Sequence, residues 1–134
     1  MTLTCEETIA VLRCADTGSR ELDAGVYEAL GGTVLTNVLA GYWREDGNGQ
    51  VPEYTTSLDA AFALLEEVVP ASRLLSLSRC KNGDKLGWTC ALQCGCAETI
   101  LSTATTAPLA LNAAIVAAWS RPSVLNFPSA AARV

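Results

Sequence analysis

The spacing of apolar and polar residues predicts two helices near the start of the chain. Thr4 and Glu7 form a capping-box pair, and apolar residues follow at helical spacing, which predicts a helix that runs to about Ala15. Ser19 can cap a second helix over residues 20–30, whose apolar side chains share one face. Two glycines follow and end this helix in the usual C-terminal manner.

The middle of the chain changes from a strand pattern to a strongly amphipathic helix. Residues 33–43 are rich in β-branched and aromatic side chains and are predicted to form a strand, and residues 44–53 an exposed polar loop. Residues 54–70 predict a helix, because a hydroxyl-rich start supplies the N-cap and Pro70 supplies the end. Its apolar stripe comprises Leu58, Ala61, Phe62, Leu65 and Val68.

The second half predicts a β-hairpin followed by a buried helix. Asn82-Gly83 lies between two strand-like runs, residues 73–80 and 85–96, and Asn-Gly in that position is the strongest short-range hairpin signal. A last helix starts near Thr106 and tolerates Pro108 in its first turn. This helix is apolar nearly all round, which indicates burial on more than one side.

This order of elements predicts an α+β fold with a small, mainly antiparallel β-sheet. Helices are expected to pack on both faces of the sheet, in an α/β/α sandwich. We expect residues 1–121 to form one domain, which suits the chain length of 134 residues. Residues 122–134 are expected to form a tail that lies on the surface or at an interface.

Composition and charge narrow the classes of partner. Half of the residues are hydrophobic and the net charge is −5. This charge argues against non-specific nucleic-acid binding, because such binding requires clustered basic residues. No apolar run reaches the roughly 18 to 20 residues of a membrane span, and the first residues lack the features of a secretory signal. We therefore expect a cytoplasmic protein with reduced thiols, no membrane partner and no nucleic-acid partner.

The stretch with the densest cysteines is GWTCALQCGC, residues 87–96. Alternate residues of a strand point to one face, so Trp88, Cys90, Leu92 and the later cysteines are expected on the buried side. This spacing differs from the paired cysteines of zinc sites. We favour core thiols and expect no metal and no cofactor, with a metal site or a redox pair as the alternatives.

Hydrolytic chemistry has few candidate residues in this chain. Histidine is absent, which removes the Ser-His, Cys-His and zinc-hydroxide mechanisms that depend on it. Neither a phosphate-binding P-loop nor a dinucleotide fingerprint is present. We expect the protein not to be an enzyme and name no catalytic residue, with a small carboxylate-dependent enzyme as a remaining alternative.

Two hydroxyl-rich helix starts are the candidate ligand site. Free amides and the helix dipole make a helix N-terminus suitable for anions, so the two starts could cradle a phosphate or nucleotide if they meet. Plain capping of the two helices is the favoured alternative. The candidate ligand-binding residues are Arg20, Trp43, Tyr54, Thr55, Thr56, Ser57, Thr105 and Thr106.

Three motifs in this order resemble the phage ABA-sandwich domain family of small phage and prophage proteins. They are TGSRELDA at residues 17–24, YTTSLDAA at 54–61 and ATTAPLALNA at 104–113. The resemblance implies an α/β/α sandwich and a phage context, and it supplies no catalytic residues. The matched polar positions lie mostly at helix starts and can equally be architectural.

These expectations lead to three functional hypotheses. The first is a non-catalytic phage accessory protein in the host bacterial cytoplasm, which binds a host protein or a small anionic, nucleotide-like ligand. The second is a minor virion or assembly protein, for which the apolar tail is mild support. The third is the carboxylate-dependent enzyme. We also expect self-association into a homo-oligomer.

Overall fold

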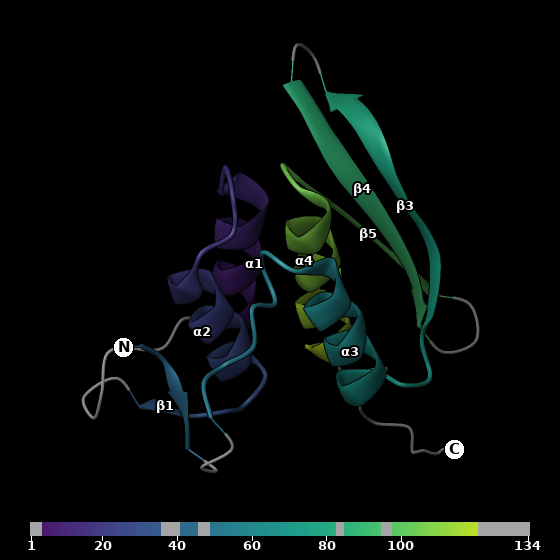
Figure 1. The fold of residues 1–134 in the computed structure, drawn as a ribbon. Coiled ribbons are helices and arrows are strands. Elements are labelled where there is room, and N and C mark those ends of the chain that lie inside the picture. Colours follow the sequence, from purple (N-terminus) through teal and green to yellow (C-terminus); the bar gives the residue numbers. More distant parts are fainter. Residues whose placement is uncertain (1–3, 36–40, 46–48, 83–84, 95–97, 121–134) are drawn as a thin grey trace.

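The computed structural model describes residues 4–35, 41–45, 49–82, 85–94 and 98–120. This part of the chain forms four helices and five strands, and the three long strands follow one another between α3 and α4 (Figure 1). The elements are α1 (Cys5–Cys14), α2 (Arg20–Ala29), β1 (Val34–Leu35), β2 (Trp43–Arg44), α3 (Leu58–Val68), β3 (Arg73–Asn82), β4 (Lys85–Cys94), β5 (Glu98–Ala104) and α4 (Ala107–Trp119).

Side-chain caps define the starts of the helices, as the sequence predicts. In α1, the Thr4 amide donates to Glu7 Oε1 at 2.9 Å, and the Glu7 amide donates to Thr4 Oγ1 at 3.1 Å. Hydroxyl oxygens of Ser19, Ser57 and Thr106 accept from backbone amides at the starts of α2, α3 and α4. Each cap satisfies one backbone donor that the helix itself leaves unpaired.

The prediction of one continuous strand over residues 33–43 is wrong. Leu35 pairs with Trp43 in an antiparallel arrangement, so the chain reverses direction between them. Gly41, with a φ of 119°, adopts a backbone conformation that interrupts an extended strand. The β-branched composition therefore marks two short strands, while residues 36–40 lie outside the described part of the chain.

The larger sheet has the antiparallel order β3-β4-β5. The predicted hairpin is confirmed, because Asn82 pairs with Lys85 across the turn. The sequence analysis missed β5 over Glu98–Ala104, although its run of threonines, isoleucine and leucine is typical of a strand. Because β5 pairs with β4 along its whole length, β4 becomes the central strand of the sheet.

The core forms between the sheet and α4. Leu92 and Ile100, which are cross-strand partners, lie in the same core cluster as Leu111 and Ile115 of α4. The four helices gather on one side of the larger sheet, and α4 lies between α1 and the strands (Figure 1). The structure confirms the predicted α+β fold with antiparallel sheets.

The position of α4 explains its nearly uniform apolar composition. Its residues are buried all round because α4 contacts α1, α3 and the strands of the larger sheet. Among the described residues, no helix combines the length and apolar character needed to cross a membrane.

Candidate functional site

A buried hydrogen-bond network connects the start of α2 to the segment before α3. We call it the Asp23 network; its members are Ser19, Arg20, Asp23, Val51 and Thr55. Asp23 is fully buried, and its Oδ1 accepts from the Thr55 amide at 2.8 Å and from Thr55 Oγ1 at 2.5 Å. Its Oδ2 pairs with the Arg20 guanidinium at 2.8 Å. A buried carboxylate needs such partners to offset its loss of hydration.

Arg20 extends the Asp23 network along the segment before α3, as far as Val51. Its second terminal nitrogen donates to the Val51 carbonyl at 2.5 Å, so one guanidinium joins α2 to the segment that precedes α3. Val51 itself is only 1% exposed and belongs to the core. The prediction that residues 44–53 form an exposed loop is therefore wrong for Val51, because this contact and core packing hold the segment against α2.

The backbone of the segment before α2 packs directly against the backbone of Thr55. A Cβ atom added at Gly18 would lie 2.1 Å from the Thr55 carbonyl oxygen, so only glycine fits there without a shift. The next amide, that of Ser19, donates to Thr55 Oγ1 at 3.1 Å. The TGSRELD and YTTS motifs of the sequence thus meet in space, and their polar atoms bind each other.

Asn112 anchors the same segment to α4. Its Nδ2 donates to the Tyr54 carbonyl at 2.7 Å and to the Pro108 carbonyl at 2.6 Å, and its side chain is fully buried. Sequence analysis did not single out Asn112. The signal that could have found it is its position as a lone polar residue in an otherwise apolar helix.

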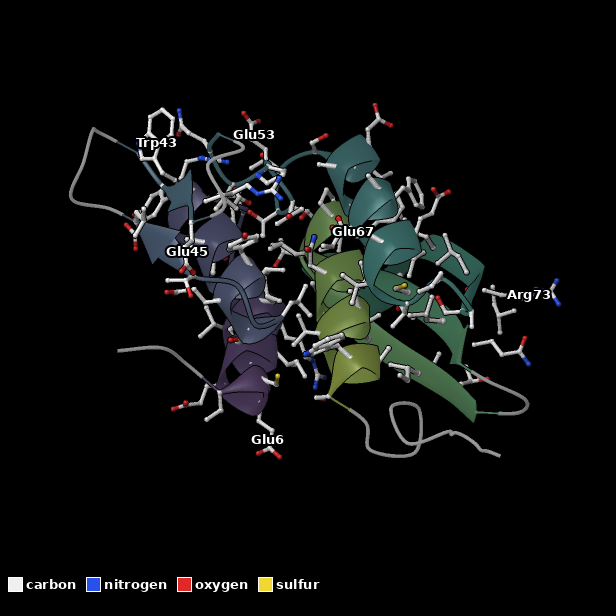
Figure 2. All side chains as sticks on the ribbon, turned by 90° about the horizontal axis from the view of Figure 1, so that it is seen from below. Glu6, Trp43, Glu45, Glu53, Glu67 and Arg73 are labelled. Atoms are coloured by element: carbon white, nitrogen blue, oxygen red, sulfur yellow. The ribbon has the colours of Figure 1, made fainter. Side chains whose placement is uncertain are left out.

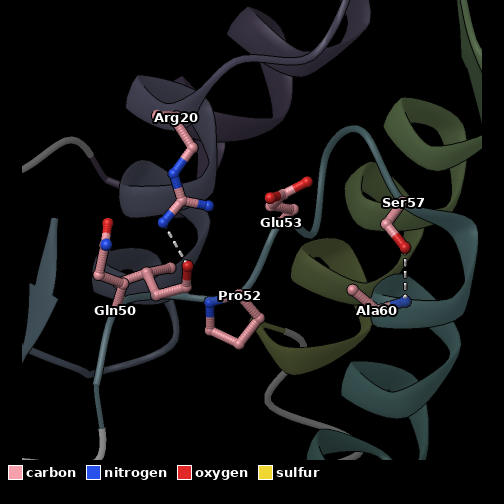
Figure 3. Close-up of a pocket in the computed structure, with 7 residues that line it drawn as sticks. Arg20, Gln50, Pro52, Glu53, Ser57 and Ala60 are labelled. Atoms are coloured by element: carbon pink, nitrogen blue, oxygen red, sulfur yellow. Dashed lines mark hydrogen bonds between the residues drawn. The ribbon is translucent and has the colours of Figure 1, made fainter. Parts of the chain in front are cut away.

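A surface pocket of about 400 Å³ lies beside the Asp23 network (Figure 3). The Arg20 guanidinium and the Glu53 carboxylate supply one charge of each sign, and the Ser57 hydroxyl already caps α3 through the Ala60 amide. The pocket therefore offers no net positive charge to an anion. Its lining residues are Arg20, Gln50, Val51, Pro52, Glu53, Ser57 and Ala60.

The structure places the candidate ligand residues in several separate parts of the fold. Arg20 and Ser57 line the pocket, and exposed Thr56 adjoins Ser57. The Thr55 hydroxyl donates to Asp23 and so belongs to the Asp23 network. Tyr54 is buried, and this burial together with the negative charge of Glu67 raises the pKa of its hydroxyl to about 12.

The remaining candidates do not line the pocket. Trp43 belongs to β2, where it pairs with Leu35 and bridges to Gln50. Thr106 caps α4, and its neighbour Thr105 is exposed. The pocket beside the Asp23 network is thus lined by Ser57 at the start of α3 and by no residue of α4.

Within the described strand, the cysteine-rich segment behaves as the alternation of side chains predicts. Cys90 and Leu92 are fully buried in the core, and Trp88 packs against it in a half-buried position. The side chain of Cys94 and all of Cys96 lie outside the described residues. In the part of the chain that is described, no three His, Cys, Asp or Glu side chains are grouped as a metal site would require.

Stability should decline at alkaline pH because of Cys90. Burial raises the pKa of this thiol to about 11, from an ordinary value of 9, by disfavouring the thiolate. Between these values the unfolded chain releases the proton and the folded chain keeps it, so stability is complete below pH 9 and falls as pH rises toward 11. We expect an excess slope of up to about 1.4 kcal/mol per pH unit in that window.

Urea unfolding of the wild type and of Cys90→Ala at pH 8, 9 and 10 measures this slope. The variant loses packing at every pH, so the relevant quantity is the change with pH and not the absolute stability. Parallel pH dependences for the two proteins would show that Cys90 ionises as freely when folded as when unfolded.

Comparison with protein-family models finds no match to this chain, and searches of curated proteins and of solved structures find no significant match either.

Proposed function

We propose that the chain is a non-catalytic phage accessory protein that binds a host protein through the outer face of its larger sheet. The outer face is the side away from α4. Cross-strand pairing places two rows of residues on it, Ser78–Thr89–Thr103 and Ser76–Ala91–Leu101. The observation that carries the proposal is Leu101, which is 70% exposed near the middle of β5 while its neighbours Ile100 and Ser102 are buried.

The composition of the outer face suits a protein partner. Apart from Leu101, the side chains of these two rows are short, so another protein surface can approach the sheet closely there. The serine and threonine hydroxyls of the rows can donate or accept hydrogen bonds without a charge to desolvate. Leu101 adds a large exposed apolar side chain that a partner can cover.

The polar motifs favour binding over catalysis for a separate reason. Asp23, Thr55 and Arg20 hold one another and the backbone, so their donors and acceptors are engaged in joining segments of the fold. A catalytic carboxylate needs access to its substrate, whereas Asp23 is fully buried. These contacts support a scaffold role for the motif residues.

A photo-crosslinking amino acid at position 101 tests the proposal in phage-infected host cells. We expect one defined crosslinked host protein, identified by mass spectrometry, and no such product from the matched probe at Ala63, an exposed position of α3. Absence of a crosslink from position 101 would contradict the proposal. Stabilisation by a nucleotide panel in a thermal-shift assay would move the function to the pocket, and detection in purified particles would support the virion role.

A further inference from the structure

The end of the β3–β4 hairpin projects beyond the helices (Figure 1). Leu86 has the same strand parity as Cys90 and therefore points to the same side of β4. Cys90 is fully buried, whereas Leu86 is 59% exposed. The helices thus cover this side of the strand at Cys90 and leave it open at Leu86. We call the projecting residues 79–82 and 85–88 the arm.

The helix-facing side of the arm combines basic and apolar groups. Arg79 pairs across the strands with Trp88, and Lys81 pairs with Leu86, so all four side chains share one face. Arg79 and Lys81 are exposed, and Trp88 is half-buried against the core. This face therefore has an apolar centre beside two positive charges, which is a suitable composition for docking on an acidic surface.

Basic side chains predominate in the described part of the larger sheet, whereas exposed carboxylates outnumber basic side chains on the helices. The described charged side chains of β3, β4 and β5 are all basic, namely Arg73, Arg79 and Lys81. Figure 2 shows Arg73 pointing outward on the opposite side of the molecule from Glu45. The helices present many exposed carboxylates, which include Glu6, Glu7, Glu21, Asp59, Glu66 and Glu67. Each copy therefore carries both members of a complementary pair of surfaces.

The surface of α1 matches the arm in apolar character as well as in charge. Glu7 and Val11 are four residues apart on α1, so they are neighbours on one helix face. Val11 is 40% exposed, and it is the large hydrophobic side chain that the described helices leave most open to solvent.

We infer that the arm of one copy docks on α1 of a second copy, with Leu86 against Val11 and Lys81 against Glu7. A two-fold axis uses this contact twice and closes the assembly as a dimer. The inference is independent of the proposed host-protein interface, which uses the opposite face of the sheet.

Light scattering on a size-exclusion column tests the dimer with two variants. The arm variant is Arg79→Ala/Lys81→Ala/Leu86→Ala, and the α1 variant is Glu7→Gln/Val11→Ser, in which Gln retains the capping box. We expect the wild type at twice the 14.0 kDa chain mass and each variant at the monomer mass. A mixture of the two variants should regain dimers, because the intact arm of one meets the intact α1 of the other.

The matched control is Arg73→Ala, which removes a basic residue from the other end of β3 and should leave the dimer intact. Higher salt should weaken the wild-type dimer, because it screens the exposed charges. All substitutions are at exposed positions, so the thermal midpoints of the variants should stay close to that of the wild type. A monomeric wild type, or an arm variant that dimerises like the wild type, would overturn the inference.

Discussion

Asp23→Ala is expected to lower the free energy of unfolding by about 2 to 4 kcal/mol. The substitution leaves the buried Thr55 amide without its acceptor, which costs about 1 to 3 kcal/mol. The Thr55 hydroxyl loses its bond to the carboxylate, worth about 1 kcal/mol, and keeps the Ser19 carbonyl as an acceptor at 3.0 Å. Arg20 loses its ion pair too, but its side chain is 35% exposed and can regain water. The Thr55 donors should therefore account for most of the effect.

Urea denaturation measures the effect, and two further variants separate its causes. Glu21→Ala, at an exposed position in the same helical turn, should change stability by less than about 1 kcal/mol. Asp23→Asn keeps one carbonyl oxygen for Thr55 and removes the charge, so its effect should lie between those of the other two. If Asp23→Ala matched Glu21→Ala, the Asp23 network would not be a major source of stability.

Local signals account for the parts of the fold that the sequence predicts well. Two such signals are the capping pair Thr4 and Glu7 and the Asn82-Gly83 turn signal. Each acts within a few residues, so its pattern can be recognised without knowledge of the tertiary structure. The Asp23–Thr55 contacts join residues 32 positions apart, and no local pattern specifies which side chains will meet over that separation. Val51 shows the same limit, because its burial depends on Arg20 and the core.

The candidate ligand site illustrates how a local pattern can have two meanings. Hydroxyl-rich helix starts can bind anions or cap their own helices, and both uses require the same side chains. In the structure Ser57 and Thr106 cap α3 and α4, and Thr55 bonds to Asp23. Arg20 was assigned correctly to the start of α2, but its partner Val51 was not foreseeable from spacing.

The strongest test of which face of the larger sheet is buried compares two leucines on adjacent strands. Leu92→Ala should lower the free energy of unfolding by about 2 to 5 kcal/mol, because Leu92 is fully buried and its removal leaves a cavity in the core. Leu101→Ala should change it by about 0.5 kcal/mol or less, because Leu101 is 70% exposed on the outer face. Chemical denaturation of both variants measures the difference.

Equal losses of stability in the two variants would mean that both faces of the sheet are covered. The expected difference between the two stability losses has a direct functional consequence, because a large apolar side chain that contributes little to folding is free to contribute to binding. Leu101→Ala would then be a stable protein, and loss of its binding to the host protein that the crosslink identifies would report on the outer face alone. Leu92→Ala cannot serve this purpose, since it would weaken binding through the fold.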